Sequence, residues 1–249
     1  MPLRDGTRRV VRSALVHVPG VYEYFSARRF VWMDRIGKVH DRDLLALPEL
    51  LPDPQPLILD VGANCGQTVL SVKRLLPGAR VVSFEPNPGS VEMLRRLCGR
   101  FPDLRIEAVG LGDRNEEADF YTPVYNGKVM SGLASFDYES ARDWLNPETL
   151  LGFRPERLEL RVGRAVIRRL DDYELLPDLI KIDAQGFEDH VVRGGMRTIE
   201  RARPVMFIEN PSPALLSVFA SLDYRACEYR ENRLFPATGT TTNQYLLPS

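Results

Sequence analysis

The sequence predicts an α/β fold built on a doubly wound, Rossmann-like sheet. Short apolar runs that end in an acid alternate with segments of helical spacing, which is the pattern of a parallel sheet covered by helices. The first unit is the run 57–60, which ends in an acid and is followed by a glycine-containing turn and a helix over 69–76. The second unit is the run 80–85, which also ends in an acid, with a helix over 88–98. Later strands are expected at 104–109, 160–167, 180–182 and 203–211, followed by a final antiparallel pair. The order and type of these elements lead us to expect a mostly parallel sheet of seven strands with an antiparallel C-terminal strand.

The turn after the first predicted strand has the features of a ligand-binding turn. Asp60 ends the strand, and Gly62, Asn64 and Gly66 shape the turn into the helix. Glycines let the backbone approach a ligand closely, and the free amides at a helix N-terminus favour an anionic group. The spacing Asp-x-Gly-x-x-x-Gly is not the Gly-x-Gly-x-x-Gly fingerprint of dinucleotide sites, which argues against a dehydrogenase.

Two further strand ends supply candidate nucleoside contacts. Glu85 ends the second strand 19 residues after Gly66, where an acid can accept hydrogen bonds from a ribose diol, and Asn87 follows it. The third strand stops before Gly112 and Asp113, where an acid and backbone amides could read an adenine edge. An ordinary turn would explain these last two residues equally well.

These motifs resemble the S-adenosylmethionine (SAM)-dependent class I methyltransferases, and among them the FkbM family. The resemblance covers about residues 57–247 and rests on Asp-Val-Gly-Ala-Asn-Cys-Gly (60–66), Phe-Glu-Pro (84–86), Leu-Asp-Asp (170–172), Ile-Lys-Ile-Asp-Ala-Gln-Gly-Phe-Glu (180–188) and Gly-Gly (194–195). It implies SAM as cofactor and O-methylation of a sugar, glycan or polyketide-type hydroxyl. Many members carry Glu where this chain has Gln185, so we expect no direct acid–base role for that position.

Asp183 is the first candidate for a catalytic base, because it stands at a core strand end where donor methyl and acceptor would meet. Glu209 ends the next strand, and His190 lies on the helix that follows Asp183. Oxygen ligands from Asp183, Glu209 and Asn210 would suit Mg²⁺, but strand-end capping and ion pairing explain them better, and we predict no metal ligand. His190 facing solvent is the alternative to a base role.

The chain is expected to divide into a helical arm, residues 1–50, and a methyltransferase domain, residues 51–249. Residues 1–42 carry nine Lys/Arg against four Asp/Glu, and the apolar run 10–18 is too short and interrupted to cross a bilayer. The arm is expected to pack on the domain or support a homodimer, with peripheral membrane contact as the alternative.

An insertion at about 118–160 is predicted to form a hairpin of 118–124 with 132–136 and a lid over the acceptor. Its aromatic residues either stack on the acceptor or cover the insertion's own core.

The charge and cysteine content limit the classes of partner that we expect for this protein. The net charge of −1 offers no field for recruiting nucleic acid, and the three cysteines have no metal-ligand spacing and fit a reducing cytoplasm. We therefore expect a cytoplasmic enzyme with a small-molecule or glycan acceptor. The alternatives are methylation of nitrogen or of a macromolecule, and a domain that binds SAM or a nucleoside without catalysis.

Overall fold

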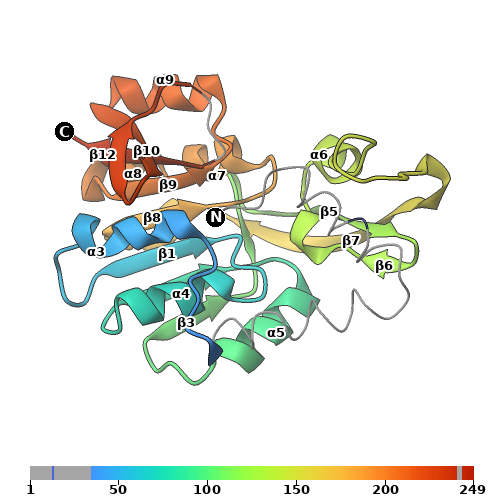
Figure 1. Cartoon of the computed structure of the whole chain (residues 1–249), viewed down its shortest axis with the longest axis horizontal. Helices are drawn as coiled ribbons and strands as arrows, with labels where there is room; N and C mark the ends of the chain where they lie inside the picture. Colours follow the sequence, from blue (N-terminus) through green and yellow to red (C-terminus); the bar gives the residue numbers. More distant parts are fainter. Residues whose placement is uncertain (1–12, 14–34, 240–242) are drawn as a thin grey trace.

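The computed structural model describes Ser13 and residues 35–239 and 243–249. Its main body is an eight-stranded sheet in the order β11-β10-β12-β9-β8-β1-β2-β3 (Figure 1). The strands are Leu57–Val61 (β1), Arg80–Phe84 (β2), Leu104–Glu107 (β3), Leu179–Ile182 (β8), Val205–Glu209 (β9), Tyr224–Arg230 (β10), Arg233–Pro236 (β11) and Asn243–Pro248 (β12). The five strands from β9 to β3 are parallel, and β12 runs antiparallel to both of its neighbours.

The predicted mixed α/β sheet is confirmed, with one strand more than the expected seven. The extra strand, β11, pairs with β10 across Glu231 and Asn232, whose φ angles are 53° and 62°. Two consecutive left-handed residues are what a tight two-residue hairpin requires. The added strand therefore lengthens one edge of the sheet without altering the order of the other seven.

Helices cover both faces of this sheet because its central strands are apolar on both sides. One face packs against Leu47–Leu50 (α3), Gln67–Leu75 (α4) and Pro88–Cys98 (α5). The other face packs against Glu188–Gly194 (α7), Met196–Ala202 (α8) and Pro213–Ser221 (α9). β8 shows the cause most plainly, since all four of its residues are buried. With both faces covered, a ligand can approach this sheet only at the ends of its strands.

The described part of the predicted arm belongs to the core of the domain. Leu44, in the 3-10 helix Arg42–Ala46 (η1), and Leu47, in α3, are buried in the same apolar cluster as Ile58. The Tyr245 hydroxyl donates to the Asp43 carbonyl at 2.8 Å, which ties this segment to β12. The proposed role of residues 1–34 concerns a segment outside the described residues, apart from Ser13. None of the helices in the described segments is long and apolar enough to cross a membrane.

The insertion forms a second sheet in the order β4-β7-β5-β6. Its strands are Gly110–Leu111 (β4), Glu116–Tyr125 (β5), Lys128–Val129 (β6) and Leu158–Arg168 (β7), and its helices are Ser131–Leu133 (η2), Tyr138–Asp143 (α6) and Pro155–Arg157 (η3). The main partner of β5 is β7, over ten residue pairs, and not the segment 132–136. Only Ser135 of that segment bridges to β5, at Tyr121, so the predicted hairpin was wrong.

Part of the insertion's aromatic content covers a small core of its own. Tyr125, Met130, Leu145 and Leu150 are buried there, and the Phe153 ring stacks on Tyr125 at 5.5 Å. Their burial supports the second of the two roles expected for these aromatic side chains.

Candidate active site

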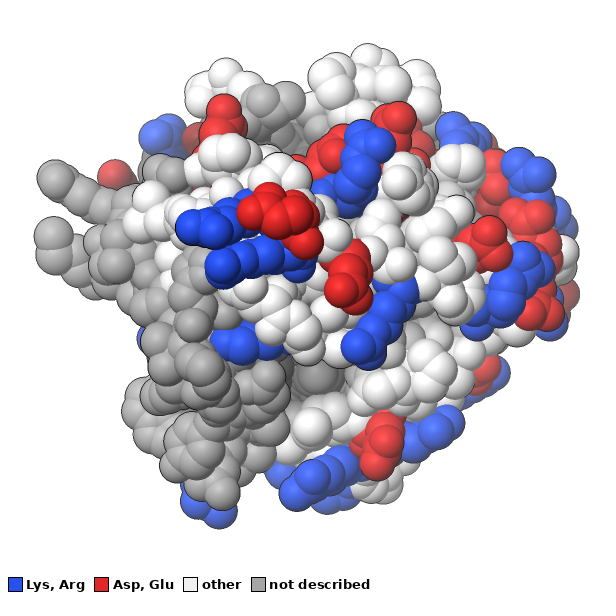
Figure 2. Space-filling view, turned by 90° about the vertical axis from the view of Figure 1, so that its right-hand side faces the viewer, with Lys and Arg blue, Asp and Glu red and all other residues white. Residues whose placement is uncertain are grey.

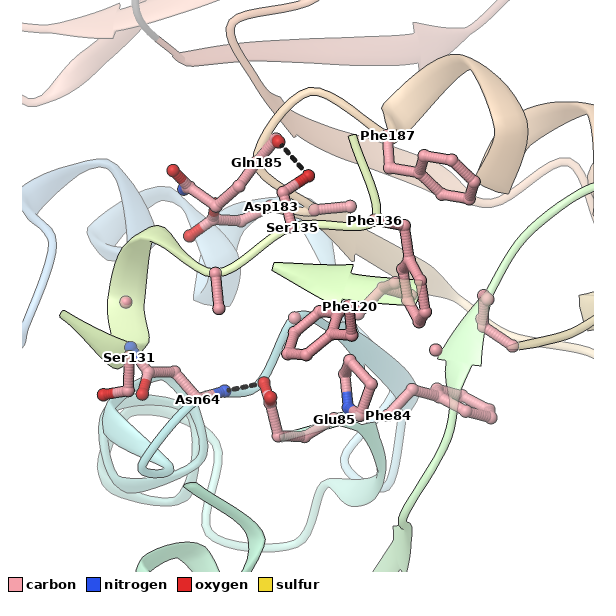
Figure 3. A pocket seen from close by; sticks show the side chains of 18 residues that line it. Asn64, Phe84, Glu85, Phe120, Ser131, Ser135, Phe136, Asp183, Gln185 and Phe187 are labelled. Carbon is pink, nitrogen blue, oxygen red and sulfur yellow. Dashed lines mark hydrogen bonds between the residues drawn. The ribbon is translucent and has the colours of Figure 1, made fainter. Parts of the chain in front are cut away.

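A pocket lies where the carboxyl ends of β1, β2 and β8 meet the insertion (Figure 3). Its walls come from three parts of the chain: the first two strand ends, the insertion with β4, and the loop after β8. The lining residues are Val61, Gly62, Asn64, Phe84, Glu85, Pro86, Gly110, Leu111, Phe120, Ser131, Gly132, Ala134, Ser135, Phe136, Asp183, Ala184, Gln185 and Phe187. This is the edge of the sheet at which doubly wound folds bind their ligands.

The turn after β1 depends on its glycines. Gly62 has a φ of 75°, and a Cβ at this position would lie 1.8 Å from the Asp183 carbonyl oxygen. Gly66, at the start of α4, has a φ of 91°, and a Cβ there would lie 2.6 Å from Cys98 Sγ. Both positions combine a left-handed backbone with close neighbours, so only glycine fits without displacement.

Glu85 faces this turn from the end of β2. Its carboxylate accepts hydrogen bonds from the N–H groups of Asn64 and Asn87, each at 2.8 Å, and only 6% of the residue is exposed. Burial raises the pKa of Glu85 to about 7, although the two backbone hydrogen bonds favour its charged form. Glu85 therefore changes charge near neutral pH at the wall of the pocket.

Asn87 is the N-cap of α5, and its side chain accepts a hydrogen bond from the N–H of Gly89 at 3.0 Å. The cap fixes the start of that helix directly after Glu85.

Asp60 lies behind the pocket wall, fully buried. Its Oδ1 is 3.3 Å from Lys181 Nζ, which also donates to the carbonyl oxygens of Val61 and Gly62 at 3.4 and 3.2 Å. Burial raises the pKa of Asp60, and the charge of Lys181 opposes that shift. The structure thus places Asp60 behind the glycine turn, paired with Lys181, a contact that the sequence interpretation did not predict.

The register in which β1 pairs with β8 explains the contact between Lys181 and Asp60. Lys181 sits opposite Asp60 on the neighbouring strand. A lysine within a four-residue buried strand needs a charge partner close by.

Asp183 extends from the end of β8 into the pocket. Gln185 Nε2 donates to Asp183 Oδ1 at 2.5 Å, and Lys181 Nζ lies 3.7 Å from Oδ2. The side chain is 24% exposed, so a ligand can reach it.

Glu209, at the end of β9, lies beside Asp183. Burial and the negative charge of Asp183 raise the pKa of Glu209. The structure therefore brings two of the three predicted catalytic residues together.

The third, His190, is stacked on Phe187 with ring centroids 4.2 Å apart. Its Nδ1 lies 3.2 Å from Asp113 Oδ2. Burial works against the charged form of Asp113, but His190 and Arg114 hold its pKa below the usual value. His190, Gly112 and Asp113 are absent from the pocket lining among the described residues. A Cβ at Gly112 would come 2.8 Å from Ile167 Cγ2, which indicates a packing role for that glycine.

Within the ranges that the structure describes, no group of three or more His, Cys, Asp or Glu side chains is placed to hold a metal ion.

A Rossmann-like sheet with a glycine turn after β1, an acid at the end of β2 and a second acid after β8 defines a class I methyltransferase-type domain. The model of the methyltransferase FkbM domain family matches residues 60–230. The chain belongs to this family, as its motifs predicted.

The chain is similar to several proteins of known name or structure. The chain is 31% identical over 173 residues to the 2-O-methyltransferase NoeI of Sinorhizobium fredii, a match that covers 67% of this chain and 66% of the relative. It is 32% identical over 182 residues to the AMB antimetabolite synthetase AmbE of Pseudomonas aeruginosa, covering 64% of this chain and 8% of that protein. The crystal structure of an FkbM methyltransferase from Methylobacillus flagellatus superposes with a TM-score of 0.52 at 16% identity, over 98% of this chain and 59% of the other. The chain thus spans less than two thirds of the length of each of these relatives.

Proposed function

We propose that this chain transfers the methyl group of SAM to a hydroxyl oxygen of a small-molecule or glycan acceptor. The observation that carries the proposal is that one pocket joins Glu85, the acid at the nucleoside end, to Asp183, the reachable acid after β8. The 2-O-methyltransferase name of the relative from Sinorhizobium fredii supports oxygen as the accepting atom.

The residues of the pocket fit SAM. Gly62 and Gly66 hold the left-handed turn that borders the pocket, and Glu85 presents a carboxylate oriented by two backbone N–H groups. We assign Glu85 to the ribose hydroxyls and the turn of Gly62, Asn64 and Gly66 to the rest of the cofactor. Asp60 and Asn87 act from behind by fixing the turn and the start of α5. SAM supplies an electrophilic methyl group, because its sulfur is a sulfonium.

Asp183 is assigned to the acceptor hydroxyl. The Asp183 carboxylate would take up the hydroxyl proton as the acceptor oxygen is methylated, and bound SAM would supply the methyl group and leave as S-adenosylhomocysteine (SAH). Glu209 lies beside Asp183, and the charge of Asp183 raises the pKa of Glu209. Much of the remaining catalysis comes from holding the oxygen in line with the methyl carbon.

The surface supports an acceptor without a large single-sign charge. On the face shown in Figure 2, basic and acidic side chains of the described residues are interspersed. Such a face offers no continuous basic stripe for a phosphate backbone. A domain that binds SAM without catalysis is disfavoured, because Asp183 is accessible from the pocket. Cytoplasmic location, a homodimer and peripheral membrane contact stay predictions.

The Asp183→Asn variant tests the proposal, because it keeps the side-chain shape and removes the charge. SAH affinity, measured by calorimetry, should barely change, while transfer of labelled methyl from SAM to a panel of sugars and hydroxylated natural products should fall by ~10²–10⁴-fold. Asp119→Asn is the matched control, since Asp119 is 49% exposed and pairs with Arg164 on the insertion.

Normal turnover in Asp183→Asn would show that catalysis here comes mainly from holding the acceptor close to the methyl group. Loss of SAH binding would place Asp183 in the cofactor site and leave Glu209, His190 and Glu188 as candidate bases. Treatment with a chelator and readdition of Mg²⁺ separates direct action of Asp183 from action through a metal.

A further inference from the structure

The loop after β8 has an unusual backbone. Gln185 and Gly186 both have positive φ angles, 51° and 91°. A left-handed glycine is common, but a left-handed glutamine is not and must be held by its surroundings. The question is which contacts hold Gln185 in this conformation.

Ser135, from the insertion, holds the carbonyl of Gln185. Its hydroxyl donates to the Gln185 carbonyl oxygen at 2.7 Å (Figure 3). The same hydroxyl accepts from the N–H of Asp137 at 2.9 Å. Ser135 is 1% exposed, and its backbone exchanges two hydrogen bonds with Tyr121 on β5, at 2.9 and 3.0 Å. The hydroxyl is therefore fixed from both sides.

Neighbouring contacts hold the same loop from the insertion and from α7. A Cβ at Gly186 would lie 2.1 Å from Ser140 Oγ, so α6 is packed directly against the turn. From the other side, Glu188 Oε1 accepts from the N–H groups of Ala184 and Gly186 at 2.9 and 3.2 Å. The loop is thus clamped between the insertion and the start of α7.

The side chain of Gln185 carries this restraint to Asp183. With its backbone fixed, Gln185 turns back and donates its amide to Asp183 Oδ1 at 2.5 Å. Among the described contacts, the route runs from Ser135 through the Gln185 carbonyl and amide to the Asp183 carboxylate. Because Gln185 lies two residues from Asp183, the backbone conformation of the turn sets the direction from which this amide meets the carboxylate.

We propose that Ser135 is a positioning residue whose hydroxyl, acting through Gln185, sets the orientation of the Asp183 carboxylate. The insertion is then a fixed support of the acceptor acid as well as a wall of the pocket. The effect on turnover rests on the proposed function of Asp183, but the contact itself does not.

The test observes Gln185 directly in the full chain. The sequence contains four glutamines, Gln55, Gln67, Gln185 and Gln244, so selective ¹⁵N-glutamine labelling gives four side-chain amide signals. Gln185→Glu assigns the signal of interest by removing it. We expect hydrogen exchange of the Gln185 side-chain amide to accelerate about tenfold in Ser135→Ala, the scale of losing one hydrogen bond. Ser135→Thr, which keeps the hydroxyl, should restore it to within about twofold.

Ser131→Ala is the matched control for this signal, since Ser131 lines the same pocket from the insertion and should leave Gln185 exchange unchanged. Ser135→Cys, nearly equal in volume, serves if the alanine variant does not fold, and an intermediate acceleration is expected. A purely structural serine would lower Tm in these variants without changing Gln185 exchange, and that result would overturn the inference.

Turnover separates the inference from the proposed function. In Ser135→Ala, kcat for methyl transfer should fall while the KM for SAM stays within about twofold of wild type. Accelerated Gln185 exchange together with normal turnover of Asp183→Asn would sustain the positioning contact and reject the catalytic role. Unchanged Gln185 exchange in Ser135→Ala, together with an inactive Asp183→Asn, would reject the positioning contact and support the catalytic role of Asp183.

Discussion

Glu85, which we assign to the ribose hydroxyls, is buried, and we expect cofactor binding to depend on its charge and therefore on pH. Burial raises the pKa of Glu85 to about 7 in the free protein. Only the charged form accepts two ribose hydroxyl hydrogen bonds, so binding favours ionisation and releases a proton. Two pH units below that pKa, about 1% of the free protein carries the charge, and SAH affinity should fall about 100-fold, or ~2.7 kcal/mol. Affinity should rise from pH 5 and level off above about pH 8.

Calorimetry with SAH measures this dependence. SAH lacks the positive charge of SAM, so the charge of the Asp183–Glu209 pair affects the affinity for SAH less than the affinity for SAM. At pH 7, titrations in two buffers of different ionisation enthalpy should show release of about half a proton per SAH bound. In Glu85→Gln the affinity should be weaker at pH 8 and flat between pH 5 and 8. Wild-type affinity that stays constant or increases as pH falls from 7 to 5 would refute the assignment of Glu85 to the ribose.

Two further predictions concern stability. Lys181→Met leaves Asp60 buried without its partner, and we expect the free energy of unfolding in urea to fall by ~3–5 kcal/mol. The Asp60→Asn/Lys181→Met double variant should recover part of this loss. An equal loss of stability in the single and the double variant would contradict the pairing. Deletion of residues 1–50 removes Leu44 and Leu47 from the core, at a cost of ~2–5 kcal/mol for each buried leucine, and should lower Tm markedly. Retention of the wild-type Tm would show that this segment is dispensable, as a separate arm would be.

The sequence was sufficient to predict the elements whose pattern is local. Short, mostly apolar runs such as Leu179–Ile182 identify buried parallel strands, and the spacing of Gly62 and Gly66 identifies the turn. Glu85 could be placed because the strand that it ends neighbours β1 in the sheet.

Contacts between distant segments could not be predicted in this way. β5 was expected to pair with the nearby segment 132–136, but it pairs with β7 over ten residue pairs, because strand propensity identifies a strand without naming its partner. The contact of Asp113 with His190 likewise joins the turn after β4 to α7. The pairing of Lys181 with Asp60 depends on the register of β8 against β1, which sets the two residues opposite each other.

The insertion leaves and rejoins the domain at neighbouring points of the backbone. β4 pairs in parallel with β7, with Gly110 opposite Ile167 and Leu111 opposite Arg168. Segments whose two ends lie close together can be exchanged between proteins with little disturbance of the host fold. We therefore expect that the insertion, which forms one wall of the pocket, can be exchanged as a cassette while the strands of the large sheet stay the same. A graft of this cassette must bring its own equivalent of Ser135, because the junction strands alone do not reproduce the contact to Gln185.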